Sequence, residues 1–179
     1  MRIIEAHQSI DELFEKWKPA LGWAYLAYRN HAYRVFNLSC ALASATGEDQ
    51  EKLALASAFH DIGIWLDNTF DYLAPSERRA VDHLSKIARE SWAEGIVQMI
   101  DQHHKVFAWH GPEQELVEAF RKADWLDVCL FSLPTRLERS LLTAVLRAFP
   151  RNGFHGRLVL LTLRWCCKHP FNPLPMLRL

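Results

Sequence analysis

The chain has 179 residues, half of them hydrophobic and seven of them tryptophan, which is enough for one domain with a full core. This apolar and aromatic content favours a well-packed globule over an intrinsically disordered chain. Because 21 Lys and Arg residues balance 21 Asp and Glu residues, no strong overall charge favours a long nucleic acid or an anionic membrane as a partner.

Patterns typical of helices fill most of the chain. Apolar residues recur at helical spacing, and two capping-box pairs, Ser9 with Glu12 and Ser91 with Glu94, predict helix starts. We expect helices over residues 9–17, 20–45, 49–60, 76–90, 91–104, 113–128, 134–148 and 157–168.

Glycine, serine and proline mark the boundaries between these segments. Gly47 and Gly63 are expected to end the helices before them, and Ser76 to cap the helix that follows a loop over residues 64–75. The tail HPFNPLPMLRL holds three prolines and is not expected to be helical. Because no segment alternates polar and apolar residues at period two, the predicted fold class is all-α.

The termini and cysteines indicate a cellular location. The N-terminal segment MRIIEAHQSIDELFEKW lacks the apolar run of a secretory signal or a membrane anchor. The four cysteines include no CxxC pair, and the two adjacent ones cannot easily bridge each other. We therefore expect reduced thiols, a cytoplasmic protein and no membrane partner.

The first indication of a functional site is the dipeptide His60-Asp61, in AFHDIG, which follows an apolar helical segment. An imidazole and a carboxylate thus emerge together from the end of a buried helix. An ionised carboxylate without a partner is costly to bury, and a divalent cation is the simplest partner that suits both groups.

Further histidines and an aspartate lie on apolar helices on either side of this pair. His31 stands upstream in RNHAYRVFNLS, and Asp124 downstream in RKADWLDV. Between the pair and Asp124 are His83, in RRAVDHLSKIA, and the adjacent His103 and His104, in MIDQHHKVF. For each of these three histidines, a hydrogen-bonding role in the core is the alternative to metal binding.

The order His, His-Asp, His, His, Asp resembles the HD superfamily of metal-dependent phosphohydrolases, through NHAYRV, FHDIG, DHL, DQHHK and KADWLD over about half the chain. The resemblance implies an all-helical fold with a divalent metal held by His31, His60, Asp61 and Asp124. It also implies a second ion held by His83 and one of His103 and His104, with Asp61 bridging.

The resemblance further implies that residues 1–179 form one HD domain, folded as a single compact helical bundle. Its metal-binding core covers about residues 20–130, followed by C-terminal helices and the proline-rich tail over about residues 134–179. The residues do not select one or two ions, nor one metal among Mn, Fe, Co, Ni, Zn and Mg.

The catalytic candidates are Asp61, as a bridging or water-orienting carboxylate, and two cations that could contact a phosphate, Arg34 and Lys105. Arg79 is a weaker candidate, and Trp65 and Phe70 could line a pocket mouth. The predicted function is hydrolysis of a small phosphorylated metabolite or nucleotide. Superfamily enzymes that cleave cyclic dinucleotides have the sequence GYP after the paired histidines, and this chain does not. Several subfamilies have Lys or His after the glycine of HDIG, where this chain has Ile64. The resemblance therefore does not assign a particular substrate to this chain.

Two alternatives stay open. The same superfamily contains oxygenases that hold two irons with this order of ligands. The second alternative is a non-catalytic, metal-stabilised module that senses a ligand or a partner.

Overall fold

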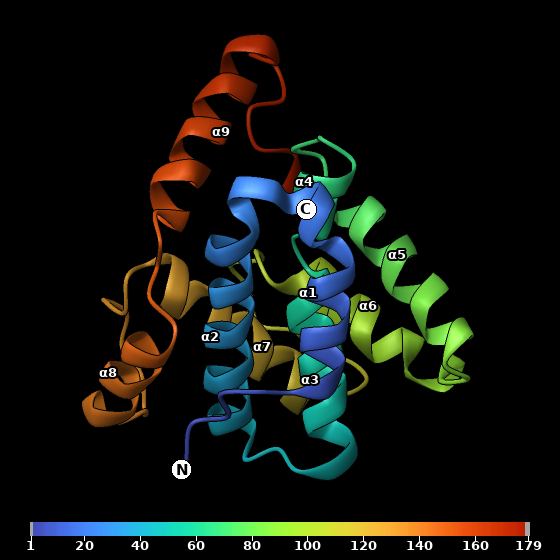
Figure 1. Ribbon diagram of the computed structural model, residues 1–179, viewed down its shortest axis with the longest axis vertical. Helices are drawn as coiled ribbons and strands as arrows, with labels where there is room; N and C mark the ends of the chain where they lie inside the picture. The colour runs from blue at the N-terminus through green and yellow to red at the C-terminus, as the bar shows by residue number, and fades with distance from the viewer. Residues whose placement is uncertain (1, 178–179) are drawn as a thin grey trace.

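The protein is all-α, as the sequence predicts. The computed structural model describes residues 2–177, which contain helices and no strand (Figure 1). The α-helices are α1 (Gln8–Leu21), α2 (Tyr25–Ala43), α3 (Gly47–Phe59), α4 (Ile62–Leu66), α5 (Leu73–Lys86), α6 (Ala93–Gln102), α7 (Gln114–Val128), α8 (Arg139–Ala148) and α9 (Phe154–Lys168). Short 3₁₀ helices cover Gly22–Ala24, Glu90–Trp92 and Pro175–Leu177.

Helix α2 is the centre of the bundle. It packs most extensively against α7 and then against α3, while α5 pairs with α6, and α8 and α9 contact α2 from the other side (Figure 1). Because α2 has neighbours all round, it is buried along almost its whole length, including its polar residues. Those polar side chains must find partners inside the protein. Asn37, for example, bonds both the N–H and the C=O of Ile4.

Several predicted helix boundaries are wrong, each for a local reason. The helix expected over residues 20–45 is interrupted at Gly22, whose φ of +50° breaks the helical path. Ser44, in the left-handed region, ends α2, and Gly47 begins α3 instead of ending its predecessor. Neither capping box forms: Ser9 bonds Glu51 of α3, and Ser91 lies within a 3₁₀ helix.

The segment expected to be a loop, residues 64–75, contains the end of α4 and the start of α5. Ser76 does not cap α5, because it lies inside this helix and accepts a hydrogen bond from the N–H of Gly63, at 3.0 Å. This contact ties α4 to α5.

The C-terminal segment folds back onto α4. Met176 is buried against Ile64, Phe70 and Tyr72 in a small apolar cluster beside the main core. The tail therefore covers part of the bundle, and its last described residues form a 3₁₀ helix where none was expected. All four cysteines are free, and none of the helices in residues 2–177 is long and apolar enough to cross a membrane.

Gly63 permits the close approach of α4 to α5. A Cβ at this position would lie 2.7 Å from the backbone oxygen of Tyr72 and 3.0 Å from Cβ of Pro75. We predict that Gly63→Ala lowers the free energy of unfolding by about 1 to 3 kcal/mol, because backbone must move to make room. Urea denaturation measures this change.

Gly156 offers the matched control. It lies in α9, and a Cβ there would meet nothing within 4 Å. Gly156→Ala should stabilise the protein by up to about 1 kcal/mol. A Gly63→Ala variant as stable as the parent would show that α4 and α5 are not packed as described.

Candidate metal centre

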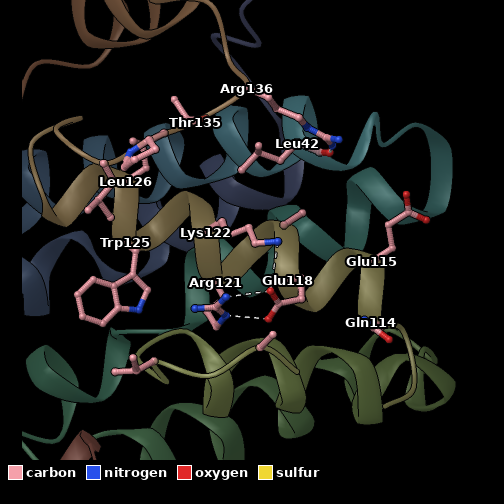
Figure 2. A pocket seen from close by; sticks show the side chains of 15 residues that line it. Leu42, Gln114, Glu115, Glu118, Arg121, Lys122, Trp125, Leu126, Thr135 and Arg136 are labelled. Atoms are coloured by element: carbon pink, nitrogen blue, oxygen red, sulfur yellow. Dashed lines mark hydrogen bonds and ion pairs between the residues drawn. The ribbon is translucent and has the colours of Figure 1, made fainter. Parts of the chain in front are cut away.

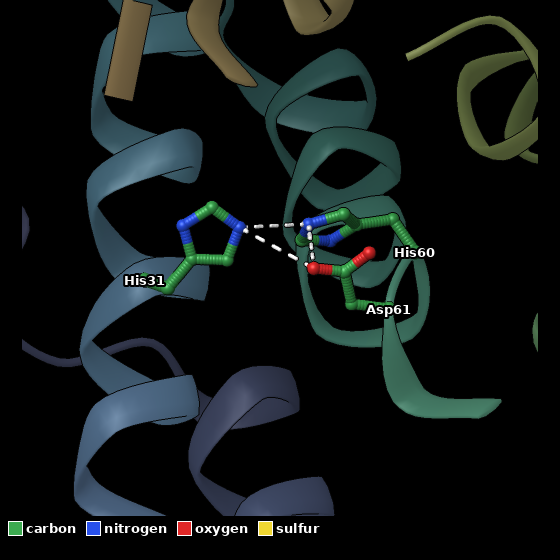
Figure 3. Close-up of side chains that lie close together, drawn as sticks. All are labelled: His31, His60 and Asp61. Atoms are coloured by element: carbon green, nitrogen blue, oxygen red, sulfur yellow. Dashed lines mark hydrogen bonds and ion pairs between the residues drawn. The ribbon is translucent and has the colours of Figure 1, made fainter. Parts of the chain in front are cut away.

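Four elements bring the first ligand group together. His31 lies in the middle of α2, His60 follows the last residue of α3, Asp61 forms the turn into α4, and Asp124 lies in α7. The break between α3 and α4 lets two adjacent residues, His60 and Asp61, face the same point (Figure 3). All four side chains are buried.

The ligand atoms of this group have the spacing of a metal site. Nε2 of His31 lies 3.0 Å from Nε2 of His60 and 3.3 Å from Oδ1 of Asp124. Oδ2 of Asp61 lies 3.4 Å from Nε2 of His60 and 3.7 Å from Nε2 of His31. Ligands bound to one ion at about 2.1 Å lie roughly 3.0 to 3.4 Å apart in octahedral or tetrahedral geometry. His31, His60 and Asp61 therefore form a group that could hold one divalent ion, and Oδ1 of Asp124 lies close enough to His31 to join it.

A second group shares Asp61. His103 and His104, at the end of α6, join Asp61 to form another set of ligand atoms that could hold an ion. Nε2 of His103 lies 3.6 Å from Oδ1 of Asp61, and Nδ1 of His104 lies 3.9 Å from Oδ2 of Asp124. The structure thus brings both paired histidines to the cluster, with the two oxygens of Asp61 facing different groups.

Three buried polar atoms at this point have no hydrogen-bond partner: Oδ1 of Asp61, Oδ1 of Asp124 and Nε2 of His103. Buried polar atoms are normally paired, and those without a protein partner call for an ion or a water. The unpaired atoms belong to ligand-type side chains in one cluster, so the residues present fit a bound metal.

The three buried histidines are held in the orientation that metal binding requires. Nδ1 of His31 meets Oδ2 of Asp127 at 2.8 Å, Nδ1 of His60 meets the carbonyl of Ser57 at 3.0 Å, and Nδ1 of His103 meets the carbonyl of Ile100. An Nδ1–H that donates to an oxygen leaves the Nε2 lone pair for an ion. Each ring thus directs Nε2 into the cluster.

The electrostatics of the site also favour a cation. Burial raises the pKa of Asp61, but His60 and His103 outweigh it and hold this pKa well below its usual range. Burial lowers the pKa of His60 to about 4 and that of His104 to about 3. For His31, burial lowers the pKa, but Asp124 and Asp127 outweigh it and raise the pKa to about 9. The carboxylates are therefore ionised and the imidazoles of His60 and His104 neutral, whereas the neighbouring carboxylates raise the pKa values of His31 and His103.

Arg34 does not face a substrate. It is fully buried, and its Nε and Nη2 donate to the two oxygens of Asp127 at 2.7 and 2.8 Å. Its Nη1 donates to the carbonyls of Phe149 and Pro150. The prediction that Arg34 contacts a phosphate is wrong, because all three side-chain nitrogens bind protein oxygens. Arg34 is a positioning residue that acts through Asp127 on His31.

His83 does not reach the metal centre. It lies near the end of α5, half-buried, with its ring 5.4 Å from that of Phe59, and belongs to neither ligand group. Partial burial and the nearby ammonium groups of Lys16 and Lys86 lower its pKa. The prediction that His83 holds a second ion is therefore wrong: its helix turns it toward the α1 side.

The remaining cationic candidates lie outside the ligand groups. Arg79 forms a two-pronged ion pair with Asp67, at 2.7 and 3.0 Å, near the surface. Lys105 follows the paired histidines and is half-buried, and its carbonyl accepts a hydrogen bond from Arg121.

Asp127 and Tyr72 are the functional residues that the sequence reasoning missed. The position of Asp127, one helical turn after Asp124, matches that of Arg34 after His31, and this parallel spacing was a usable hint. Tyr72 is buried and hydrogen-bonded to Nε2 of His104. Nothing in the local pattern of Tyr72 marks it as part of the site.

Two cavities lie near these helices. The smaller, of about 300 Å³, is lined by Asp61, His104 and Phe70 among others. Phe70 thus lines a pocket as expected, whereas Trp65 is not among its lining residues.

The larger cavity, of about 950 Å³, contains no residue of the metal cluster in its lining (Figure 2). In its wall, Glu118 pairs with Arg121 at 2.7 Å and with Lys122 at 3.3 Å. The metal centre therefore opens to the smaller cavity.

Comparison with protein-family models matches the HD domain family over residues 28–129. This range contains both ligand groups as well as Arg34 and Asp127. No curated protein and no solved structure matches the chain.

We predict that metal content depends on the clustered histidines and not on His83. His60→Ala should leave the purified protein without the ion of the first group, and His103→Ala should lower the stoichiometry by one ion. His83→Ala should keep the parent's metal content, because this ring lies elsewhere. Elemental analysis by mass spectrometry measures all three, and loss of metal from the His83 variant would contradict the assignment.

Asp127→Asn tests the support of His31. Removing the charge that holds both Arg34 and His31 should weaken metal binding by about 10- to 100-fold. It should also lower the free energy of unfolding by about 3 to 5 kcal/mol, because the Arg34 charge stays buried without a partner. Calorimetric metal titration and denaturation measure the two effects.

The control is Asp67→Asn, which breaks the pair with Arg79 near the surface. This variant should cost less than about 1 kcal/mol and leave metal affinity unchanged. If Asp127→Asn binds metal as tightly as the parent, Asp127 has only a packing role.

Proposed function

The chain belongs to the HD domain family, a superfamily of the metal-dependent hydrolase type, and from that premise we propose that it hydrolyses a small phosphate ester. The observation that carries this proposal is the shared carboxylate. One oxygen of Asp61 faces His31 and His60, and the other faces His103. A carboxylate that bridges two ions is the arrangement of two-metal phosphoryl-transfer sites.

Divalent ions bound there would supply a water of lowered pKa and polarise a phosphoryl oxygen. The residues of the chain hold this arrangement in place. Asp127 keeps the Nδ1 proton on His31, and backbone carbonyls do the same for His60 and His103. If Nε2 of neutral His104 carries the proton and donates it to the hydroxyl oxygen of Tyr72, Nδ1 of His104 keeps its lone pair on the side of Asp124.

Burial of the site strengthens each of these interactions. Asp61 and Asp124 are almost wholly inaccessible, and His31, His60 and His103 entirely so. Electrostatic stabilisation of a phosphoryl group is larger in such surroundings than in water. With Arg34 engaged in the protein, Lys105 is the remaining candidate cation for a substrate phosphate, although it does not line the cavity beside Asp61.

One observation favours a second function, oxidation of an organic substrate by two irons held by the same residues. Among residues 2–177, no Lys or Arg side chain lines the cavity beside Asp61 and His104. A phosphate site commonly has such a cation. Metal identity and oxygen consumption separate the two functions.

We expect metal-dependent release of phosphate from at least one member of a panel of small phosphate esters, assayed with Mn, Co, Ni, Mg or Zn. Asp61→Asn should abolish release, because it removes the charge shared by the two ligand groups. His83→Ala is the control and should release phosphate at the parent's rate. If no metal supports release while purified protein carries two irons and consumes oxygen, the oxygenase function replaces the hydrolase.

A further inference from the structure

The cavity beside the metal centre is strongly apolar. It has a volume of about 300 Å³, and Asp61 and His104 are among the residues that line it. The rest of its wall consists mainly of aliphatic and aromatic side chains, among them Ile64, Phe70 and Leu158. A molecule bound at the metal centre would extend its remaining atoms into this space.

Part of the cavity wall comes from the C-terminal segment. Leu158, Val159 and Leu163 of α9, together with Met176 of the tail, line the cavity. The family match ends at residue 129, so this wall lies outside the matched range. This part of the cavity wall therefore lies outside the segment that the family model covers, whereas Ile64 and Phe70 lie inside it.

The polar side chains that line the cavity already form hydrogen bonds within the protein or belong to the metal cluster. Tyr72 is hydrogen-bonded to His104, and the Thr162 hydroxyl donates to the carbonyl of Leu158 at 2.8 Å. Asp61 and His104 belong to the metal cluster. The hydroxyl groups of a sugar or the edges of a nucleobase would lose water here without gaining partners, which costs binding energy.

The mouth of the cavity is apolar as well. Val159 and Leu163 are 59% and 58% exposed, on the face of α9 that lines the cavity. Large aliphatic side chains left in water at the entrance of a pocket mark a site for an apolar ligand. The volume is at the low end for pockets that enclose small ligands, which suits a short chain or a single ring.

We propose that this cavity is the subsite for the apolar organic group of the substrate. Combined with the proposed function, on which the reaction rests, the substrate class is the phosphate monoester of an apolar aliphatic or aromatic alcohol. The phosphate lies at the metal cluster, and the alcohol lies between α4 and α9.

The first test compares phosphate esters by kcat/KM with added metal. From ethyl to butyl to hexyl phosphate, kcat/KM should rise by about fourfold for each methylene that is buried. Glucose 6-phosphate and ribose 5-phosphate should be poorer substrates than hexyl phosphate. Turnover of either sugar phosphate that equals or exceeds turnover of hexyl phosphate overturns the proposal.

The second test changes the wall without touching the metal cluster. Leu163→Glu places a charge in the cavity wall at a largely exposed position that tolerates it, and Val159→Glu is a second variant of the same kind. Either should remove the gain from ethyl to hexyl phosphate. Val81→Glu, on the exposed part of α5 outside the cavity, is the matched control and should keep that gain.

A binding assay separates this proposal from the proposed function. Hexanol should bind the protein more tightly than ethanol in titrations followed by NMR, and Leu163→Glu should abolish the difference. If hexanol binds in this way but no phosphate ester is cleaved, the apolar subsite stands and the phosphohydrolase function fails. If sugar phosphates are cleaved and hexanol does not bind, the function stands and the subsite is refuted.

Discussion

The carboxylate of Asp127 connects the parts of this protein that matter for its chemistry. It accepts hydrogen bonds from Arg34 and faces Nδ1 of His31, so it joins α7 to α2 and directs a ligand toward the metal centre. Arg34 in turn binds the carbonyls of Phe149 and Pro150, in the segment between α8 and α9. The helix pair, the ligand and the approach to α9 therefore depend on one buried group of charges.

The C-terminal segment is tied to the same place by packing. The ring of Phe154 stacks on His31 at 4.0 Å between centroids, and Nε2 of His155 lies 3.0 Å from the carbonyl oxygen of Asp127. Helix α9 begins at these residues and continues along the apolar cavity. The wall of the proposed apolar subsite and the candidate metal ligand His31 thus share one anchor.

The sequence correctly indicated the residues that are recognisable from the order of His and Asp along the chain. It did not indicate the residues whose role depends on how the helices pack. His31, His60, Asp61 and Asp124 converge because each lies at a helical position facing the core. His83 has a comparable apolar setting, but α5 packs so that this ring meets Phe59. A local pattern cannot specify toward which neighbour a helix turns its half-buried face.

Arg34 is a second case in which a local sequence pattern indicates burial but not the partner. Its apolar neighbours correctly indicate burial, yet the partner that uses its charge lies 93 positions away in the chain. Likewise, the tail that covers α4 has no periodicity that announces where it packs. Long-range pairing decides these features, whereas helix existence and the main ligand order are decided locally.

The anchoring of three imidazoles through Nδ1 has a consequence for metal exchange. Rings already fixed by protein oxygens lose little rotational freedom when an ion arrives, so loading requires little reorganisation of the backbone. The gain in stability on loading then follows mass action, about 2.7 kcal/mol when the free ion is at a hundred times its dissociation constant. A site held in this way would select among ions by their availability and preferred coordination geometry, without refolding around each one.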